Sequence, residues 1–468
     1  MFTWRWGASL GRKAVAGPSH STAVDPGIRE RVVRKVAWRL MPFLGLLYFI
    51  NYLDRTNIGF AAPHGMNDAL GFDKAAFGLA SGIFFIGYLL LEVPSNLILN
   101  KVGARRWIAR IMVSWGIVAS LMAFVPNALS MYGLRFLLGI AEAGFFPGII
   151  LYLTFWFPKR ERARAVALFM IAIPVSSVIG SPLSAWLISA GHGLVFGLDG
   201  WRFMFLVEGL PAILIGVLCW FYLTDKPQDA AWLTAEERNW LQNEMDTEHA
   251  QTSQRYHYPL RKALTQPRIL ALAFVYFGVV YGLYAVGFFL PTIIAGFKQA
   301  FNTEYSIIEQ GFIVAIPYAF GAIAMYLWAR HGDSTGERVW HVAIPTIVGG
   351  LAIPVALYMQ SPFTTMIAVT ICAMGICSAL PTFWALPTRF LTGAAAAGGI
   401  ALINSLGNLA GFVGPYVTGW LTDLTGNPKA GLWVVGAFMI AAGVIAVLLK
   451  AAPAPDDERV AETDTLAV

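Results

Sequence analysis

The chain has 468 residues, of which 57% are hydrophobic and only 13% carry a charge, and its mean hydropathy is +0.62. A soluble globule of 51.0 kDa needs far more charge on its surface, so these values exclude a soluble enzyme or binding domain. They indicate a polytopic membrane protein.

Apolar stretches of roughly 20 residues, the length that crosses hydrocarbon as a helix, recur twelve times along the chain. The first six lie near 37–59, 75–99, 105–125, 129–156, 164–190 and 203–223. The second six lie near 268–296, 306–329, 338–359, 364–387, 396–422 and 430–449. We therefore expect an all-α fold of twelve transmembrane helices.

Polar segments divide this series into five parts. Residues 1–36 are polar and basic without an apolar run of signal-peptide length, which predicts a cytoplasmic tail. Two six-helix bundles are expected at 37–224 and 267–450. The linker between them, 225–266, contains Thr234 and Glu237 at capping-box spacing and should form an amphipathic surface helix. Residues 451–468 are an acidic cytoplasmic tail.

Lysine and arginine gather on one side of the predicted membrane. The N-terminal tail, the loops near 101–106 and 159–164 and the linker are basic, whereas the opposite loops 60–73, 126–128 and 424–428 contain no Lys or Arg. The positive-inside rule then puts both termini in the cytoplasm, in an inner (plasma) membrane. These loops explain the net charge of +6, so no nucleic-acid partner is required, and we expect a monomer.

The two halves share an internal repeat. The turn "NKVGARRW" after the second span and "DSTGERVW" after the eighth align at an offset of 233 residues. The matching pairs are Asn100 with Asp333, Gly103 with Gly336, and Arg105 with Arg338, and Pro182 matches Pro415 at the same offset. Two parallel six-helix repeats with a central linker are typical of transporters that bind substrate at the repeat interface.

Several motifs resemble a known family. The turn at 100–106 is similar to the signature of the major facilitator superfamily, with Asn100 where many members have Asp. The segments "NYLDRTNIGFA", "FFIGYLLLEVPSN", "RFLLGIAEAGFFPG", "YLTFWFPKRERARA", "WRFMFLVEGLPA" and "GGIALINSLGNLAGFVGPY" together resemble its anion:cation symporter family, nearest to bacterial permeases for tartrate, phthalate and hydroxyphenylacetate. The resemblance implies the major facilitator fold and proton-coupled import of an organic anion.

Four charged side chains lie inside predicted spans: Asp54, Arg55, Arg135 and Glu142. Each costs roughly 2.5–3.5 kcal/mol near the middle of a membrane helix. On the first span Tyr48, Asn51, Tyr52 and Arg55 form one stripe at helical spacing, and Arg135 on the fourth span is expected at the depth of Arg55.

These residues suit an anion site. Two guanidinium groups, two tyrosines and an amide at one depth would bind a carboxylate. Asp54 and Glu142 are candidate proton carriers, because a semi-buried carboxylate favours its protonated form. The resemblance implies the same roles for the four charged residues. The alternative is that they only brace the fold by pairing with one another.

The second half supplies aromatic and amide groups instead of charges. Tyr284, with Tyr276 and Tyr281, would form an aromatic wall, unless these tyrosines only anchor helices at the interface. By resemblance, Trp384 and Asn404 match substrate-lining positions, whereas we expect Asn408 to serve helix packing.

Other polar residues are assigned structural roles. Asn100, Gly103, Arg105, Asp333 and Arg338 are candidates for a conformational latch at helix ends. Glu92 is expected to face the basic turn near residue 100, and Glu208 to cap the region of Arg202.

Three rival functions are weighed against import. Export or exchange by the same fold is open, because direction follows gradients. A receptor of transporter fold usually carries a larger linker or tail. An enzyme would need an assembled nucleophile, metal or acid-base set, but all seven histidines lie in tails, loops or helix ends. We expect no cofactor and no metal, and proton coupling in preference to sodium. The identity of the acid stays open.

Overall fold

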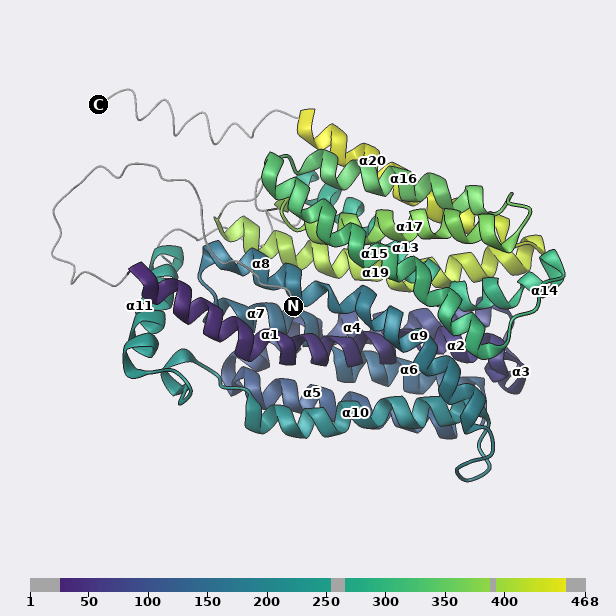
Figure 1. Ribbon diagram of the computed structural model, residues 1–468, viewed down its shortest axis with the longest axis horizontal. Helices are drawn as coiled ribbons and strands as arrows, with labels where there is room; N and C mark the ends of the chain where they lie inside the picture. The colour runs from purple at the N-terminus through teal and green to yellow at the C-terminus, as the bar shows by residue number, and fades with distance from the viewer. Residues whose placement is uncertain (1–25, 254–265, 388–392, 452–468) are drawn as a thin grey trace.

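The chain folds into a bundle of long helices (Figure 1). The structure is a computed structural model that describes residues 26–253, 266–387 and 393–451; the predicted tails up to residue 25 and from residue 452, and linker residues 254–265, lie outside this range. The long helices are α1 (Pro26–Thr56), α4 (Lys74–Val102), α5 (Ala104–Leu121), α6 (Ala128–Glu142), α7 (Phe145–Trp156), α8 (Lys159–Met170), α9 (Ala172–Gly191), α10 (Gly200–Tyr222), α13 (Pro267–Ala295), α15 (Ile307–Thr335), α16 (Val339–Ala356), α17 (Pro362–Phe383), α19 (Gly393–Thr425) and α20 (Lys429–Ala451).

Twelve membrane crossings are confirmed. Eleven are helices or helix pairs of the described chain that are long and apolar enough to span a membrane. The twelfth is α19, whose 33 residues extend about 50 Å at the rise of an α-helix. No strand is present in the described residues, so the all-α prediction is also confirmed.

Three crossings differ from the predicted helices: two are interrupted and one starts earlier. The fourth is broken at Ala143 and Gly144, between α6 and α7, where Gly144 has φ +85° in the left-handed region that glycine tolerates. The fifth is divided at Ile171, between α8 and α9. The first begins at Pro26, eleven residues before the predicted start at 37, because the basic N-terminal segment continues the helix.

The bundle has two distinct ends. Short helices α2 (Ile58–Ala61), α3 (Met66–Leu70) and α14 (Phe297–Phe301) lie at one end, on the right of Figure 1; we call it the loop side. The start of α1, the end of α20 and the linker helix α11 (Ala235–Ser253) lie at the other end, the terminal side. The helices before the linker lie beside those after it, with α4 against α19 and α9 against α15.

Glycines bring the two halves into close contact near the loop side. A Cβ at Gly59 would lie 2.9 Å from the Phe288 carbonyl oxygen of α13, and one at Gly311 would lie 2.8 Å from the Ser181 carbonyl oxygen of α9. Gly78 meets the Pro415 carbonyl in the same way. Small residues are the usual means of close helix packing in membranes. The halves are therefore closed against each other at this end.

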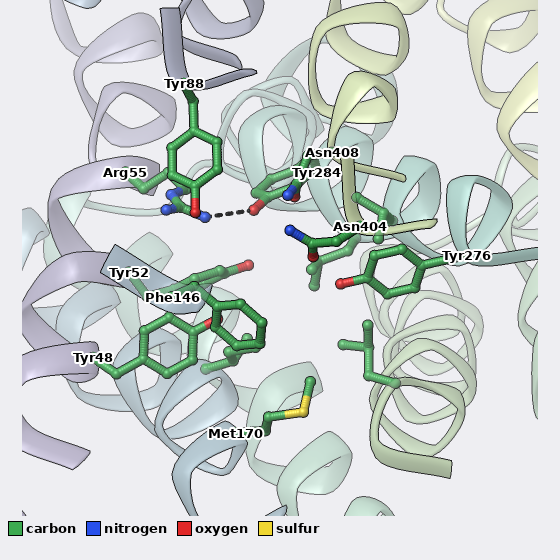
Figure 2. Close-up of a pocket in the computed structure, with 14 residues that line it drawn as sticks. Tyr48, Tyr52, Arg55, Tyr88, Phe146, Met170, Tyr276, Tyr284, Asn404 and Asn408 are labelled. Atoms are coloured by element: carbon green, nitrogen blue, oxygen red, sulfur yellow. Dashed lines mark hydrogen bonds between the residues drawn. The ribbon is translucent and has the colours of Figure 1, made fainter. Parts of the chain in front are cut away.

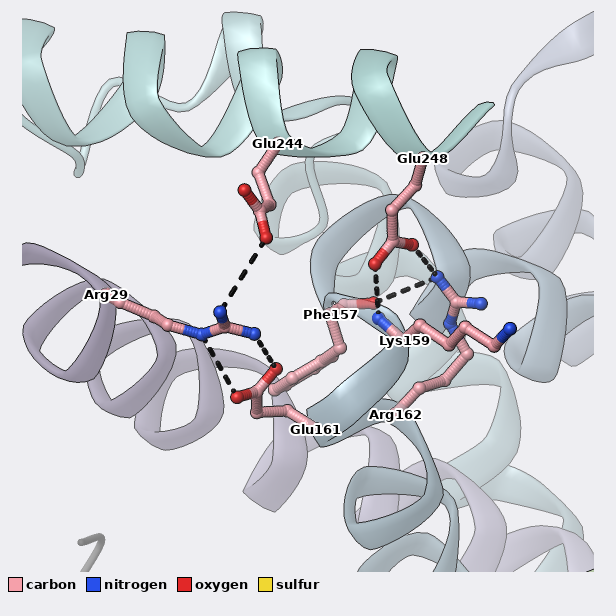
Figure 3. Close-up of polar contacts among 7 residues, drawn as sticks. All are labelled: Arg29, Phe157, Lys159, Glu161, Arg162, Glu244 and Glu248. Atoms are coloured by element: carbon pink, nitrogen blue, oxygen red, sulfur yellow. Dashed lines mark hydrogen bonds and ion pairs between the residues drawn. The ribbon is translucent and has the colours of Figure 1, made fainter. Parts of the chain in front are cut away.

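The linker helix is attached to the first half by ion pairs, which Figure 3 shows. Arg29 of α1 contacts Glu161 at 3.1 Å and Glu244 of α11 at 3.9 Å, and Arg162 contacts Glu248 at 3.0 Å. The predicted capping box is confirmed, because the Glu237 carboxylate accepts from the Thr234 backbone N–H and the Thr234 hydroxyl accepts from that of Glu237. The linker therefore stays with the first half on the terminal side.

Two glycines of α6 test the close helix packing inside the first half. Gly139 lies against the Phe84 carbonyl of α4, and a methyl group there would be 2.9 Å from the Tyr88 nitrogen. We expect Gly139→Ala to destabilise the protein by about 1–3 kcal/mol, the usual cost of overpacking, and to lower the melting temperature in detergent. Gly133→Ala is the control, because a Cβ there meets nothing within 4 Å. Equal melting temperatures for the two variants would contradict the packing described.

Candidate functional site

A small cavity lies between the two halves at the level of Arg55 (Figure 2). Its volume is about 30 Å³, room for roughly two waters on a scale of 10–15 Å³ each. Side chains must therefore move before an organic acid can enter. The lining residues are Tyr48, Tyr52, Arg55, Tyr88, Phe146, Met170 and Ile173 from the first half, and Tyr276, Val280, Leu283, Tyr284, Leu380, Asn404 and Asn408 from the second.

Arg55 is the central polar group of this cavity, and its side chain is held from three directions. Its Nε donates to Glu142 at 3.0 Å, its Nη2 donates to the same carboxylate and to Asn51 at 3.3 Å, and its Nη1 donates to the Tyr284 hydroxyl at 2.9 Å. Figure 2 shows the Tyr284 bond, which crosses from α1 to α13. Arg55 therefore connects the two halves while it faces the cavity.

Glu142 reaches Arg55 because the fourth crossing breaks beside it. It is the last residue of α6, is fully buried, and forms an ion pair with Arg55. The sequence placed Arg135 at the depth of Arg55, whereas the fourth-span residue that pairs with Arg55 in the structure is Glu142.

Arg135 lies next to the site without lining the cavity. Its Nε donates to the Ala80 carbonyl at 3.2 Å and its Nη2 to the Ser81 carbonyl at 3.3 Å, both on α4, and a weaker contact of 3.5 Å reaches the Arg55 carbonyl. Among the described residues, no carboxylate lies within ion-pair distance of it. The structure therefore gives Arg135 a backbone-binding position, where we had expected it beside the substrate.

Asp54 is also directed away from the cavity. The side chain is fully buried, and one oxygen accepts a hydrogen bond from the Trp115 indole at 2.7 Å. The other oxygen has no partner in the described chain. Asp54 and Arg55 are adjacent in sequence but point into different surroundings, because successive residues of a helix are about 100° apart.

The second-half residues are placed as follows. Tyr284 and Asn404, the predicted binding residues, line the cavity, and so does Asn408, which the sequence analysis assigned to helix packing. Trp384 lies behind the cavity wall, with its ring centroid 4.9 Å from that of Tyr276. Asn51 is likewise behind the wall and supports Arg55.

Four lining residues of the first half were not predicted from the sequence. Tyr88, Phe146, Met170 and Ile173 line the cavity from α4, α7, α8 and α9. Tyr88 lies four residues before Glu92 and shares its helix face. An acidic residue inside a span could therefore have indicated that this face of α4 is turned toward a polar site. Phe146 lies just after the first helix break, and Met170 and Ile173 lie on either side of the second, and apolar periodicity does not reveal either break.

Two predicted placements of buried acids are wrong. Glu92 does not face the basic turn: its carboxylate accepts from Asn404 and, at 3.3 Å, from the Ser405 hydroxyl on α19. Glu208 does not cap the Arg202 region: it accepts from Asn57 at 3.0 Å and Ser184 at 2.6 Å. Arg202 instead donates to the carbonyl oxygens of Ala123 and Val125.

The candidate latch residues lie in two equivalent turns on the terminal side. Gly103 and Gly336 both have positive φ, at +98° and +68°, as their repeat positions suggest. Arg105 contacts Asp225, at the point where the first half joins the linker, at 3.9 Å, and Arg338 contacts Asp333 at 2.7 Å within the second half. Asn100 is exposed. In this conformation each turn is fastened to its own half.

Twelve crossings around a polar cavity shared by two packed halves define a multi-pass membrane protein of transporter architecture. Residues 44–415 and 287–467 match the family model of the Major Facilitator Superfamily, and the chain belongs to this family. The predicted membership in the major facilitator superfamily is confirmed.

Known proteins similar to the chain extend this result. A protein of Agrobacterium vitis named "Putative tartrate transporter" is 52% identical over 439 residues, covering 94% of this chain and 96% of the relative. A "Quinolone resistance transporter" of Acinetobacter baumannii is 41% identical, covering 87% and 92%. The solved structure of the xylose transporter XylE from E. coli, in a partially occluded inward open conformation, has the same fold, with TM-score 0.70, 15% identity and coverage of 90% and 99%.

The bond between Trp115 and Asp54 can be tested by a double-mutant cycle. Trp115→Phe removes the indole donor and should lower the free energy of unfolding by about 1–3 kcal/mol, because a buried acceptor loses its partner. Asp54→Asn retains an acceptor of lower charge, so Trp115→Phe should cost less in that background. Thermal unfolding of the four proteins in detergent measures the coupling. Identical costs in both backgrounds would argue against a charge-assisted bond.

Proposed function

We propose that the chain is a proton-coupled symporter of a small organic anion, a carboxylate such as tartrate, an aromatic acid or a sugar acid. The observation that carries the proposal is Arg55, a guanidinium that faces the interhalf cavity and is paired with a carboxylate. Guanidinium groups bind carboxylates in two-point geometry, so a substrate carboxylate can replace that of Glu142. The name of the Agrobacterium relative supports this substrate class.

Glu142 supplies the coupling step in this proposal. When its carboxylate is ionised, it pairs with Arg55 and excludes an anion from the same donors. Protonation of Glu142 frees Arg55 to bind the substrate carboxylate, and loss of the proton on the opposite side displaces the substrate. Asp54 directly precedes Arg55 in the sequence. It is buried, and one of its carboxylate oxygens has no partner in the described chain, so it is proposed as the second proton carrier.

The apolar body of the acid would lie among the tyrosines. Tyr48, Tyr52 and Tyr276 offer ring faces and hydroxyls on both sides of the cavity, and Asn404 offers an amide for a hydroxyl or second acid group. Arg135 and Trp384 do not line the cavity. They are proposed to position the residues that do, Arg135 by holding α4 and Trp384 by packing against Tyr276.

Alternating access completes the proposal. The bundles 37–224 and 267–450 would rock about the cavity, with the linker 225–266 and both termini on the cytoplasmic side of an inner membrane and the chain acting as a monomer. The closed loop side would then be the outer side. The latch residues Asn100, Gly103, Arg105, Asp333 and Arg338 would set the balance between the two conformations.

Arg55→Lys tests the binding role. Lysine keeps the charge but loses the fork that contacts Glu142, Asn51 and Tyr284 together, so tartrate affinity should fall at least about tenfold. A thermal-shift screen against a panel of carboxylic acids selects the ligand, and titration of purified protein measures the Kd. Arg110→Lys, on a guanidinium over the Trp107 ring, is the control. Unchanged affinity in Arg55→Lys would refute the role.

Glu142→Gln and Asp54→Asn test proton coupling. The amide that replaces the carboxylate cannot ionise. Uphill uptake driven by a pH gradient in proteoliposomes should therefore be abolished, while counterflow remains measurable. Glu208→Gln is the matched control, since Glu208 is an equally buried acid of the same half whose bonds go to Asn57 and Ser184. Full uphill accumulation in both Glu142→Gln and Asp54→Asn would rule out these carriers.

A second function, export of a drug-like compound, is favoured by one observation, the 41% identity to the quinolone resistance transporter. The same fold and cavity can operate outward when the gradients require it. Norfloxacin uptake into everted membrane vesicles, which reports proton-driven export, and tartrate uptake into right-side-out vesicles, which reports symport, separate the two. Proton-driven accumulation of norfloxacin without tartrate transport would support the exporter.

A further inference from the structure

Glu92 is a buried acid for which the proposed mechanism has no use. It lies on α4, four residues beyond the cavity-lining Tyr88, and is 4% exposed. One carboxylate oxygen accepts from the Asn404 amide and the other accepts from the Ser405 hydroxyl at 3.3 Å. Both partners belong to α19, so both bonds join the first half to the second.

The other buried acids described in the first half, Asp54, Glu142 and Glu208, bond within that half, whereas the buried cation Arg55 also crosses to Tyr284. Glu208 contacts Asn57 and Ser184, and Ser95, three residues after Glu92 on α4, accepts from the Trp107 indole. These contacts explain helix packing inside one bundle. Glu92 differs because its bonds must break or shift whenever α4 and α19 move apart.

Asn404 makes this link relevant to the site. The residue lines the cavity, and its side-chain amide donates to Glu92. An N–H that is engaged by a carboxylate is not available in the same geometry to a substrate oxygen. Each wall of the cavity thus has a polar group whose donors are bound by a glutamate. Arg55 is bound by Glu142, and Asn404 is bound by Glu92.

We infer that Glu92 is an internal competitor and interhalf clasp: its carboxylate takes the place of a substrate oxygen on Asn404 and holds α4 to α19 until substrate displaces it. The inference rests on the proposed function for its substrate part, and on the structure alone for the clasp. Glu92 is a positioning residue, since it acts through Asn404.

The competition has a distinctive binding signature. Glu92→Ala releases Asn404, so the Kd for tartrate should fall roughly three- to tenfold, the scale of one hydrogen bond. In an Asn404→Ala background the same change should leave the Kd unaltered. A residue that only stabilised the fold would weaken binding in both backgrounds. Ser95→Ala, on the same helix, is the control and should bind as the unaltered protein does.

The clasp is measured separately, without ligand. Spin labels at Lys101→Cys and Ser334→Cys report the distance between the terminal ends of α4 and α15, both exposed and in different halves, while the three native cysteines are buried. Glu92→Ala should widen the distance distribution relative to Ser95→Ala, with a melting temperature that shows the variant is folded. Glu92→Gln, which keeps one acceptor and the side-chain size, should give an intermediate width.

The outcomes distinguish the two proposals. Tighter tartrate binding that depends on Asn404, together with a wider distribution, supports the inference. Unchanged or weaker binding in Glu92→Ala, or a distribution equal to that of Ser95→Ala, overturns it. If tartrate binds none of the proteins, that substrate assignment fails, and the distance measurement alone then decides the clasp.

Discussion

The structure depends on how one buried cation, Arg55, is kept satisfied at membrane depth. Its donors are distributed over Glu142 of α6, Asn51 of its own helix and Tyr284 of the opposite half. Several local features serve this arrangement. The helix break after Glu142 places that carboxylate at the last position of α6, and close glycine contacts bring α13 near enough for Tyr284 to reach. A charge that would be costly in lipid therefore becomes a link between the two halves.

The two buried arginines illustrate the difference between a binding group and a brace. Arg135 donates to backbone carbonyls of α4, which cannot leave without unwinding a helix. Arg55 donates to side chains, each of which can rotate away or change its protonation state. Only the second kind of partner can be exchanged for a substrate carboxylate, so the proposed binding role of Arg55 rests on the chemistry of its partners and not on its charge alone.

Periodicity and composition were sufficient to predict the twelve crossings, the linker helix and the presence of charged residues within the first half. They could not predict which side chains these charged residues would contact. Asp54 and Arg55 are adjacent in the sequence, yet the turn of the helix directs them to different partners. Asp54 contacts Trp115 and Arg55 contacts Glu142. Glu92 and Asn404 are 312 residues apart, and only the packing of α4 against α19 brings them together. Long-range contacts between apolar helices leave little trace in a single sequence, because many apolar faces are interchangeable.

The proposed mechanism also explains why proton and anion should move together. In the empty site, the ionised Glu142 carboxylate pairs with Arg55. In the loaded site, Glu142 is protonated and the substrate carboxylate pairs with Arg55 instead. Both states are locally neutral. A protonated site without substrate would leave Arg55 uncompensated while the halves rock, at a cost of roughly 2.5–3.5 kcal/mol on insertion scales. Since about 1.4 kcal/mol is a factor of ten, such a leak state would be populated on the order of a hundredfold less. Coupling then follows from charge neutrality at one residue, without a separate gate that recognises the proton.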